Sequence, residues 1–140
     1  MTVSRLLLQL LVLLGVLLVH YGEARTYRRF ARRHIDHPKT GANNLDAYCN
    51  KMMRRRRMTR PRCKLSNTFI HAPPNSIIAV CGSGGTHFRD KLYDSWSSFP
   101  MTLCSNTGRF PRCKYNGRTL NQRVRLKCER GKPVHFESLL

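Results

Sequence analysis

Two histidines, His34 and His135, have sequence surroundings suited to acid–base chemistry. An unperturbed imidazole titrates at about pH 6.5, so near neutral pH one ring can remove a proton while a second ring donates one. A lysine beside such a pair would stabilise the negative charge that accumulates on phosphorus during phosphoryl transfer. The residue types therefore allow a His/His/Lys site, although no spacing rule selects the lysine.

The elements that must position these histidines lie at opposite ends of the chain. Residues 27–34 suit a short helix, on which His34 shares one face with the apolar side chain of Phe30. Residues 133–136 suit a strand, with His135 on the face opposite its apolar side chains. A cleft between this helix and this strand would bring the two imidazoles together.

Residues 1–24 have the layout of a secretory signal peptide. Arg5 precedes an almost unbroken apolar run at 6–19, and small residues end the segment, so we expect cleavage after Ala24. The rival interpretation, a membrane anchor, is disfavoured because a span needs roughly 18–20 apolar residues. The predicted organisation is a leader followed by one secreted, extracellular domain at 25–140.

The composition limits the classes of protein and of partner. A hydrophobic content of 41% excludes a disordered basic tail, and 24% charged residues exclude a multi-span membrane protein. The 26 Lys and Arg against 7 Asp and Glu give a net charge of +19, which indicates an anionic partner such as nucleic acid, a heparan-type polyanion or an anionic membrane.

The 6 cysteines are an even number in an exported chain, which fits three disulfides but leaves about fifteen pairings open. A zinc site is the alternative use, and it is disfavoured because the chain has no Cys-x-x-Cys.

Helical signals come before strand signals, which predicts an α+β domain. The further predicted elements are a helix from Leu45 capped by Asn43 or Asn44, a strand at 67–72, a short helix at 73–81, a loop at 81–86, turns at 106–108 and 116–117, and a strand at 123–128.

Two clusters of positive charge accompany these elements. Arg54–Arg57 are four adjacent arginines, predicted to form a solvated corner; a plain solvated face and an anion or import-receptor contact both remain open. In the strand at 123–128, alternation turns Val124, Leu126 and Cys128 inward and places Arg123, Arg125 and Lys127 on the other face.

Three segments resemble the pancreatic-type ribonuclease superfamily. The heptapeptide "CKLSNTF" at 63–69 matches the signature of that superfamily, and "FARRH" at 30–34 and "PVHFE" at 133–137 follow in the family's order. The resemblance covers residues 25–140. Within the superfamily, "YCNKMMRRRRMT" at 48–59 and "HFRD" at 87–90 are similar to angiogenin and non-mammalian leukocyte-type ribonucleases.

The resemblance implies three short helices packed on a curved, V-shaped antiparallel β-sheet, and a monomer. It also implies three disulfides: Cys49–Cys104, Cys63–Cys113 and Cys81–Cys128. It assigns catalysis of metal-free and cofactor-free RNA cleavage to His34, Lys64 and His135. The substrate-binding residues that it implies are Arg33, Asn67, Thr68, Phe136, Glu137 and Glu129.

Two positions depart from the family pattern. Arg33 stands where the family usually has Gln, and a guanidinium there would depress the pKa of His34 by like-charge repulsion. Glu137 stands where Asp usually orients the last histidine, and its side chain is one methylene longer. Both changes predict modest turnover.

The resemblance implies a secreted endoribonuclease that cleaves 3′ of pyrimidines through a 2′,3′-cyclic phosphate. The alternative is an angiogenin-like signalling or antimicrobial protein in which polyanion or membrane binding outweighs catalysis. That alternative adds a ribonuclease inhibitor or a cell-surface receptor as partner, and uptake with nuclear or nucleolar entry through Arg54–Arg57. A third alternative, a purely heparin-binding, chemokine-like protein, is disfavoured because it gives no role to His34, Lys64 and His135 together.

Any Cys→Ser change in these pairs is expected to lower the melting temperature sharply. Loops of about 50 residues are worth roughly 4 kcal/mol each in the chain-entropy model, a large share of the stability of a small domain. Thermal unfolding followed by circular dichroism measures the change, and a shift of only a few degrees would contradict the pairing.

Overall fold

The computed structural model describes residues 2–140, with side chains for residues 4–19 and 26–140. Its helices are α1 (Thr2–His34), α2 (Leu45–Arg55), α3 (Pro74–Ile78) and the 3₁₀ helix η1 (Ala79–Cys81). Its strands are β1 (Ser66–Ile70), β2 (Gly85–Arg89), β3 (Leu92–Ser95), β4 (Phe99–Asn106), β5 (Tyr115–Gln122), β6 (Val124–Glu129) and β7 (Lys132–Leu139). The predicted α+β class is confirmed.

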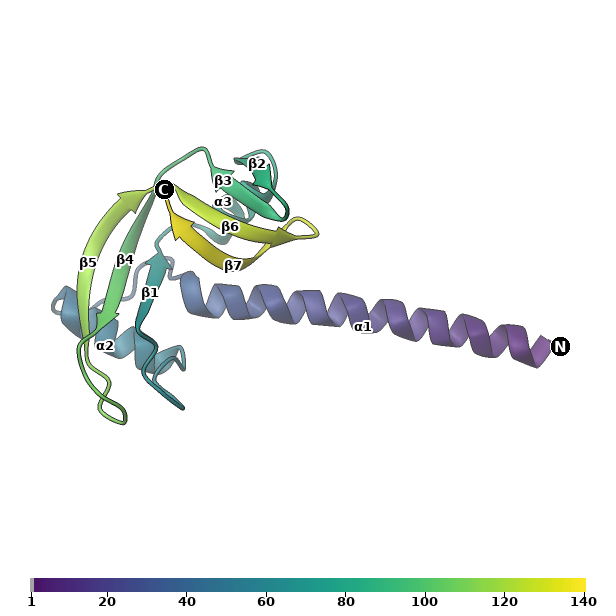
Figure 1. The fold of residues 1–140 in the computed structure, drawn as a ribbon, viewed down its shortest axis with the longest axis horizontal. Coiled ribbons are helices and arrows are strands. Elements are labelled where there is room, and N and C mark those ends of the chain that lie inside the picture. The colour runs from purple at the N-terminus through teal and green to yellow at the C-terminus, as the bar shows by residue number, and fades with distance from the viewer. Residues whose placement is uncertain (1) are drawn as a thin grey trace.

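The strands form two antiparallel sheets rather than one continuous sheet. One has the order β1-β4-β5 and the other the order β2-β3-β6-β7. The two sheets diverge as the arms of a V, with the end of α1 between β1 and β7 (Figure 1). The V-shaped arrangement agrees with the prediction, and it places the first and last parts of the folded domain side by side.

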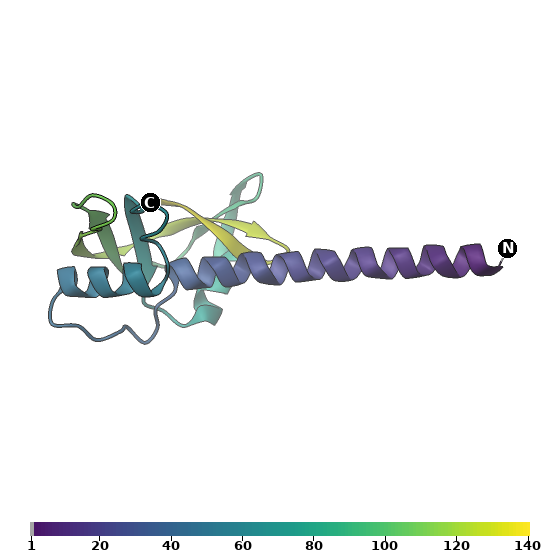
Figure 2. The ribbon, with the colours of Figure 1, turned by 90° about the horizontal axis from the view of Figure 1, so that it is seen from below.

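Helix α1 is longer than the helix predicted at 27–34, because it begins at Thr2 and runs through the apolar residues 6–19 without a break (Figure 2). The large apolar side chains of residues 6–19 are 46–66% exposed, so this part of α1 is not packed in either core. No helix in the described part of the chain combines the length and hydropathy of a membrane span.

Helix α2 has the predicted start and the predicted apolar face. The Asn44 side chain accepts a hydrogen bond from the Ala47 N–H at 2.8 Å, which caps the helix. Tyr48, Cys49, Met52 and Met53 are buried in one core cluster, together with Phe69, Cys104 and Tyr115. A second cluster includes Phe30, Ile70, Val124 and Leu126, and joins α1 to both sheets.

Three disulfides connect these elements: Cys49–Cys104, Cys63–Cys113 and Cys81–Cys128. They are the pairs that the resemblance implies. The first lies inside the core beneath α2, the second joins the segment before β1 to the segment before β5, and the third joins η1 to β6.

The predicted turn at Asn116-Gly117 is wrong, since both residues lie inside β5. Glycine is needed there for close packing: a Cβ on Gly117 would lie 2.5 Å from the Leu45 carbonyl oxygen. The Gly117 N–H also donates to Asp46 Oδ1 at 2.9 Å. The predicted loop at 81–86 is shorter than expected, because Gly85 and Thr86 already belong to β2.

The prediction that all four arginines of 54–57 are solvated is also wrong for Arg56. Its side chain is 26% exposed and turns under the end of α1. Arg56 Nη1 donates to the carbonyl oxygens of Ala31, Arg32 and Ile35 at 3.4, 2.7 and 2.9 Å. The Ala31 carbonyl oxygen also accepts from the Ile35 N–H at 2.9 Å, and carbonyls at a helix end commonly lack a partner within the helix, so a guanidinium can be half buried there.

Arg56→Ala is expected to cost about 2–3 kcal/mol of unfolding free energy, because charged hydrogen bonds to buried groups are lost. Arg55→Ala is the matched control, since Arg55 is exposed and adjacent. Urea denaturation of both variants measures the difference. Equal losses would contradict the role of Arg56.

Candidate active site

The end of α1, the start of β1 and the middle of β7 enclose a cleft of about 470 Å³. Eight predicted site residues line it: Arg33, His34, Lys64, Asn67, Thr68, His135, Phe136 and Glu137. The helix and strand expected to carry the two histidines therefore do meet at one cleft.

His34 is buried, with 7% of its surface exposed, in the last turn of α1. Its Nδ1 lies 2.9 Å from the Thr68 carbonyl oxygen. Because a carbonyl can only accept, Nδ1 carries the hydrogen in the neutral ring and Nε2 has the free lone pair. The rings of Phe30 and Phe136 lie at centroid distances of 5.1 and 5.3 Å and fix the plane of the imidazole.

The pKa of His34 is lowered from 6.5 to about 3. Burial is the main cause, because it penalises the charged ring, and the positive charges of Lys64, Arg33 and His135 lower it further. The hydrogen bond to Thr68 acts in the opposite direction. The predicted repulsion by Arg33 is present, but it is smaller than the effect of burial.

Lys64 is joined to α1 through a chain of side chains. Its Nζ donates to Asn67 Oδ1 at 2.8 Å, and Asn67 Nδ2 donates to the Arg33 carbonyl oxygen at 2.7 Å. Burial and the neighbouring Arg33 charge lower the pKa of Lys64. The buried Nε of Arg33 donates to no acceptor among the described residues. The cleft therefore contains crowded, incompletely satisfied positive charge.

His135 is more accessible than His34. Its side chain is 62% exposed, and its Nε2 lies 3.8 Å from Glu137 Oε2. Two residues apart on β7, both side chains lie on the same face of the strand, as period-2 geometry requires.

The structure does not bring Glu129 to the cleft. Glu129 ends β6, where Oε1 lies 3.4 Å from Lys91 Nζ. Its register partner is Lys132, at the far end of β7 from the cleft. We therefore leave Glu129 out of the substrate-binding set.

The charged face of β6 is only partly available to an external anion. Arg125 makes two hydrogen bonds to Asp94, at 2.6 and 2.9 Å, and lies 3.5 Å from the Phe88 ring centroid. Arg123 Nε donates to the Ser95 carbonyl oxygen at 2.7 Å. These side chains are held by the fold, although the predicted alternation of β6 itself is confirmed.

Three further residues line the cleft and were not predicted: Ser66, Leu103 and Leu139. Leu103 lies opposite Thr68 in the β1–β4 register. No local signal marks Leu103, because its place depends on which strand pairs with β1.

Comparisons with known proteins decide the family. The family model described as "Pancreatic ribonuclease" matches residues 25–137. The chain belongs to the pancreatic ribonuclease family. It is 51% identical to the iguana (Iguana iguana) protein "Ribonuclease pancreatic" over 79% of this chain and 95% of that protein. It is 42% identical to mouse (Mus musculus) angiogenin, over 79% of this chain and 76% of that protein.

The structural comparison agrees. The crystal structure of green turtle egg white ribonuclease matches with a TM-score of 0.80 and 45% identity, covering 82% of this chain and 98% of that chain. The resemblance inferred from the three motifs is confirmed. Membership of this family supports ribonuclease activity with RNA as the substrate.

The burial of His34 predicts that stability falls on acidification. Between about pH 6.5 and pH 3 the unfolded chain binds a proton at His34 that the folded chain excludes, which costs up to about 1.4 kcal/mol per pH unit. Urea denaturation against pH, compared with His34→Gln, isolates this contribution. NMR titration of the His34 ring near pH 6.5 in the folded protein would contradict it.

Proposed function

We propose that this protein is a secreted endoribonuclease that cleaves RNA 3′ of pyrimidines without a metal or cofactor. The observation that supports this most directly is the convergence of His34, Lys64 and His135 from three separate elements on one cleft. The family to which the chain belongs makes RNA the expected substrate.

In the first step, Nε2 of His34 accepts the proton of the ribose 2′-OH, and the oxygen attacks the adjacent phosphorus. The bond from phosphorus to the 5′ oxygen of the next nucleotide breaks, and His135 donates a proton to that leaving oxygen. The product is a 2′,3′-cyclic phosphate. Water then opens the cyclic phosphate with the histidine roles reversed. DNA lacks the attacking hydroxyl, so it binds without being cleaved.

The low pKa of His34 favours the first reaction step in one respect and hinders it in another. The ring is neutral at neutral pH, as a base must be, but it is a weak base while the cleft is without an anion. A bound phosphate places negative charge beside the ring, opposes the effect of Arg33 and Lys64, and raises the pKa of His34. Substrate binding therefore strengthens the base.

Lys64 stabilises the negative charge that builds on phosphorus, together with the backbone N–H of Phe136. Its hydrogen bond to Asn67 holds the ammonium group at the cleft, so little reorganisation is needed during the reaction. Arg33 adds a second positive charge. Modest turnover follows from the weak base and from the longer side chain of Glu137, which orients His135 at 3.8 Å.

Thr68 selects the base through its hydroxyl and backbone N–H. It is buried on β1, an edge strand of its sheet, so one side of its backbone is not used by a neighbouring strand. The edge of a pyrimidine base presents hydrogen-bond donors and acceptors. The Thr68 N–H can donate to an acceptor there, and the Thr68 hydroxyl can donate or accept.

Export requires removal of residues 1–24, and the exposure of the apolar side chains of α1 supports this assignment. The released protein would then be residues 25–140, which include every residue of the cleft.

A second candidate function is a cationic effector in signalling or host defence. Arg54 and Arg55, in the last turn of α2, and Arg57, just after the helix, are exposed, and the chain has a net charge of +19. This surface would bind heparan-type polyanions, anionic membranes or a receptor, and it is the segment through which uptake and nuclear or nucleolar entry would occur. A ribonuclease inhibitor remains a further proposed partner.

The test compares wild type, His135→Ala and His87→Ala, expressed from the full sequence in a secreting cell. Removing a general acid is expected to lower RNA cleavage by roughly 10²–10⁴-fold, while His87, on β2 away from the cleft, leaves it unchanged. RNA cleavage by the wild type is expected to persist in EDTA. The mass of the secreted protein is expected to equal that of residues 25–140.

Bacterial killing by the same three proteins separates the two candidate functions. Loss of cleavage with killing intact in His135→Ala makes catalysis incidental to defence. Wild-type cleavage no greater than that of His135→Ala would overturn the enzyme proposal.

A further inference from the structure

One of the three disulfides lies between two positively charged segments of identical sequence. Residues 61–64 and 111–114 both read Pro-Arg-Cys-Lys, and the Cys63–Cys113 bond joins them. The segments lie just before β1 and just before β5, at the same end of one sheet (Figure 1). Each of the two sulfurs therefore has an arginine before it and a lysine after it in the chain.

The other two disulfides lack this positive surrounding. The sequence neighbours of Cys49, Cys81 and Cys104 are uncharged, and Cys128 stands between a lysine and a glutamate. Cys49 and Cys104 are completely buried, Cys128 is 5% exposed, and Cys81 packs against the same core cluster as Cys128. These two disulfides therefore offer a charged reagent less access and no electrostatic attraction.

Cys113 lines a hollow of about 450 Å³ between α2 and the loop from β4 to β5. Its Sγ lies 3.6 Å from the carbonyl oxygen of Thr59, which lines the same hollow. The charged side chains of the lining are Arg54, Arg112 and Lys114, without a carboxylate. All three are exposed and form no ion pair within the described residues. A small anion is therefore attracted towards this sulfur.

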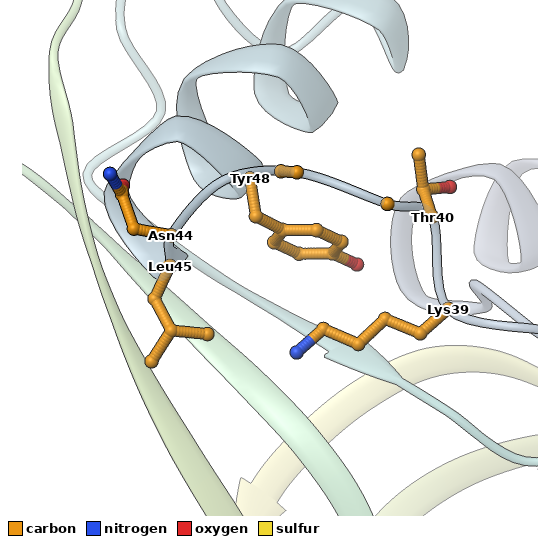
Figure 3. Close-up of a pocket in the computed structure, with 7 residues that line it drawn as sticks. Lys39, Thr40, Asn44, Leu45 and Tyr48 are labelled. Atoms are coloured by element: carbon orange, nitrogen blue, oxygen red, sulfur yellow. The ribbon is translucent and has the colours of Figure 1, made fainter.

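A hollow with a similar volume shows the difference. The hollow between α2 and the segment before it measures about 350 Å³, and a single positive side chain, Lys39, lines it (Figure 3). The Lys39 Nζ lies 5.2 Å from the centre of the Tyr48 ring, and the lining includes no cysteine. That hollow offers an anion one cation and nothing to react with, whereas the hollow at Cys113 offers three cations and a disulfide sulfur.

The same disulfide helps to hold the segment of the catalytic lysine. Cys63 directly precedes Lys64 in the chain. The Lys64 carbonyl oxygen accepts a hydrogen bond from the Tyr115 hydroxyl at 2.7 Å, and Tyr115 lies two residues after Cys113. The Lys64 segment is thus attached to the start of β5 by one covalent bond and one hydrogen bond. Breaking the covalent bond leaves only the weaker attachment.

We propose that the Cys63–Cys113 disulfide is a reversible redox site, which reacts selectively with small anionic thiols such as glutathione and lowers RNA cleavage when it is reduced. The selectivity for anionic thiols stands by itself, whereas the effect on cleavage rests on the proposed function. Exposed disulfides are in general the labile and regulatory ones, and nearby cations favour the thiolate form of cysteine.

The reduction takes two thiol–disulfide exchange steps. The thiolate of the first reductant attacks Cys113 Sγ, and the sulfur–sulfur bond breaks with its electron pair leaving on Cys63. A second thiolate attacks the reductant sulfur of the mixed disulfide, which releases oxidised reductant and a Cys113 thiolate. Two thiols are oxidised to one disulfide, and their two protons pass to the two cysteines. Arg112 and Lys114 attract the reagent, and Arg62 stabilises the departing Cys63 thiolate.

The test treats the oxidised protein, expressed from the full sequence in a secreting cell, with glutathione or with the cationic thiol cysteamine. Thiolate concentrations are equal and the ionic strength is low. Alkylation followed by mass spectrometry measures which cysteines are released and how fast. Cys63 and Cys113 are expected to react first, and about tenfold faster with glutathione than with cysteamine. High salt is expected to bring the two rates together.

In the triple variant R62Q/R112Q/K114Q the preference for glutathione is expected to fall to about one. The matched control R28Q/K39Q/R89Q removes the same charge from exposed positions on α1, the segment after α1, and β2. It is expected to keep the tenfold preference. Equal rates with the two thiols in wild type overturn the proposal, as does a preference that survives in R62Q/R112Q/K114Q or is equally lost in the control. Simultaneous release of all 6 cysteines also overturns it.

RNA cleavage by protein in which only Cys63 and Cys113 are reduced tests the link to Lys64. A fall of at least about tenfold is expected, because a displacement of about 1 Å at a catalytic group can lower the rate by roughly 10²-fold. Reoxidation with oxidised glutathione is expected to restore cleavage. Unchanged cleavage after this selective reduction overturns the link. If oxidised wild type cleaves no RNA, the proposed function fails, and the alkylation rates still decide the selectivity for anionic thiols.

Discussion

The last turn of α1 is held in place by groups that come from far along the chain, and the cleft depends on that attachment. Arg56 caps the helix end through three carbonyl oxygens, and Arg32 Nη1 donates in return to the Arg56 carbonyl oxygen at 2.8 Å. Asp36, just past the helix, accepts from Tyr48 and Thr40. These contacts hold the end of α1 in place, and with it the position of His34 against Thr68.

The fold holds positively charged side chains close together at the cleft, in spite of their mutual repulsion. Burial alone would raise the pKa of Asp36, but hydrogen bonds from Tyr48 and Thr40 and the charge of Arg56 lower it, so a carboxylate beneath α1 remains ionised. Among the described residues neither Arg33 nor Lys64 forms an ion pair, although the Glu137 carboxylate lines the same cleft. The disulfides and buried cores supply the energy that holds these cations close, and a phosphate is the group that would satisfy them.

The formal charge of +19 overstates what is available to a ligand. Arg56, Arg123 and Arg125 are engaged by the protein itself, through helix carbonyls, a strand carbonyl and a carboxylate. Alternation along a strand and adjacency along a chain predict which way a side chain leaves the backbone. They do not predict whether a distant segment of the protein places a hydrogen-bond acceptor beside that side chain.

Four features could be predicted from the amino-acid sequence: the α+β class, the helix from Leu45 with its cap, the alternation of β6, and the family. Each depends on local propensity, periodicity or a contiguous motif. Three features became known from the folded structure: Arg56 turns inward, Gly117 lies in a strand against Leu45, and Glu129 is remote from the cleft. Those outcomes depend on which distant segments meet, and no local pattern encodes such a meeting.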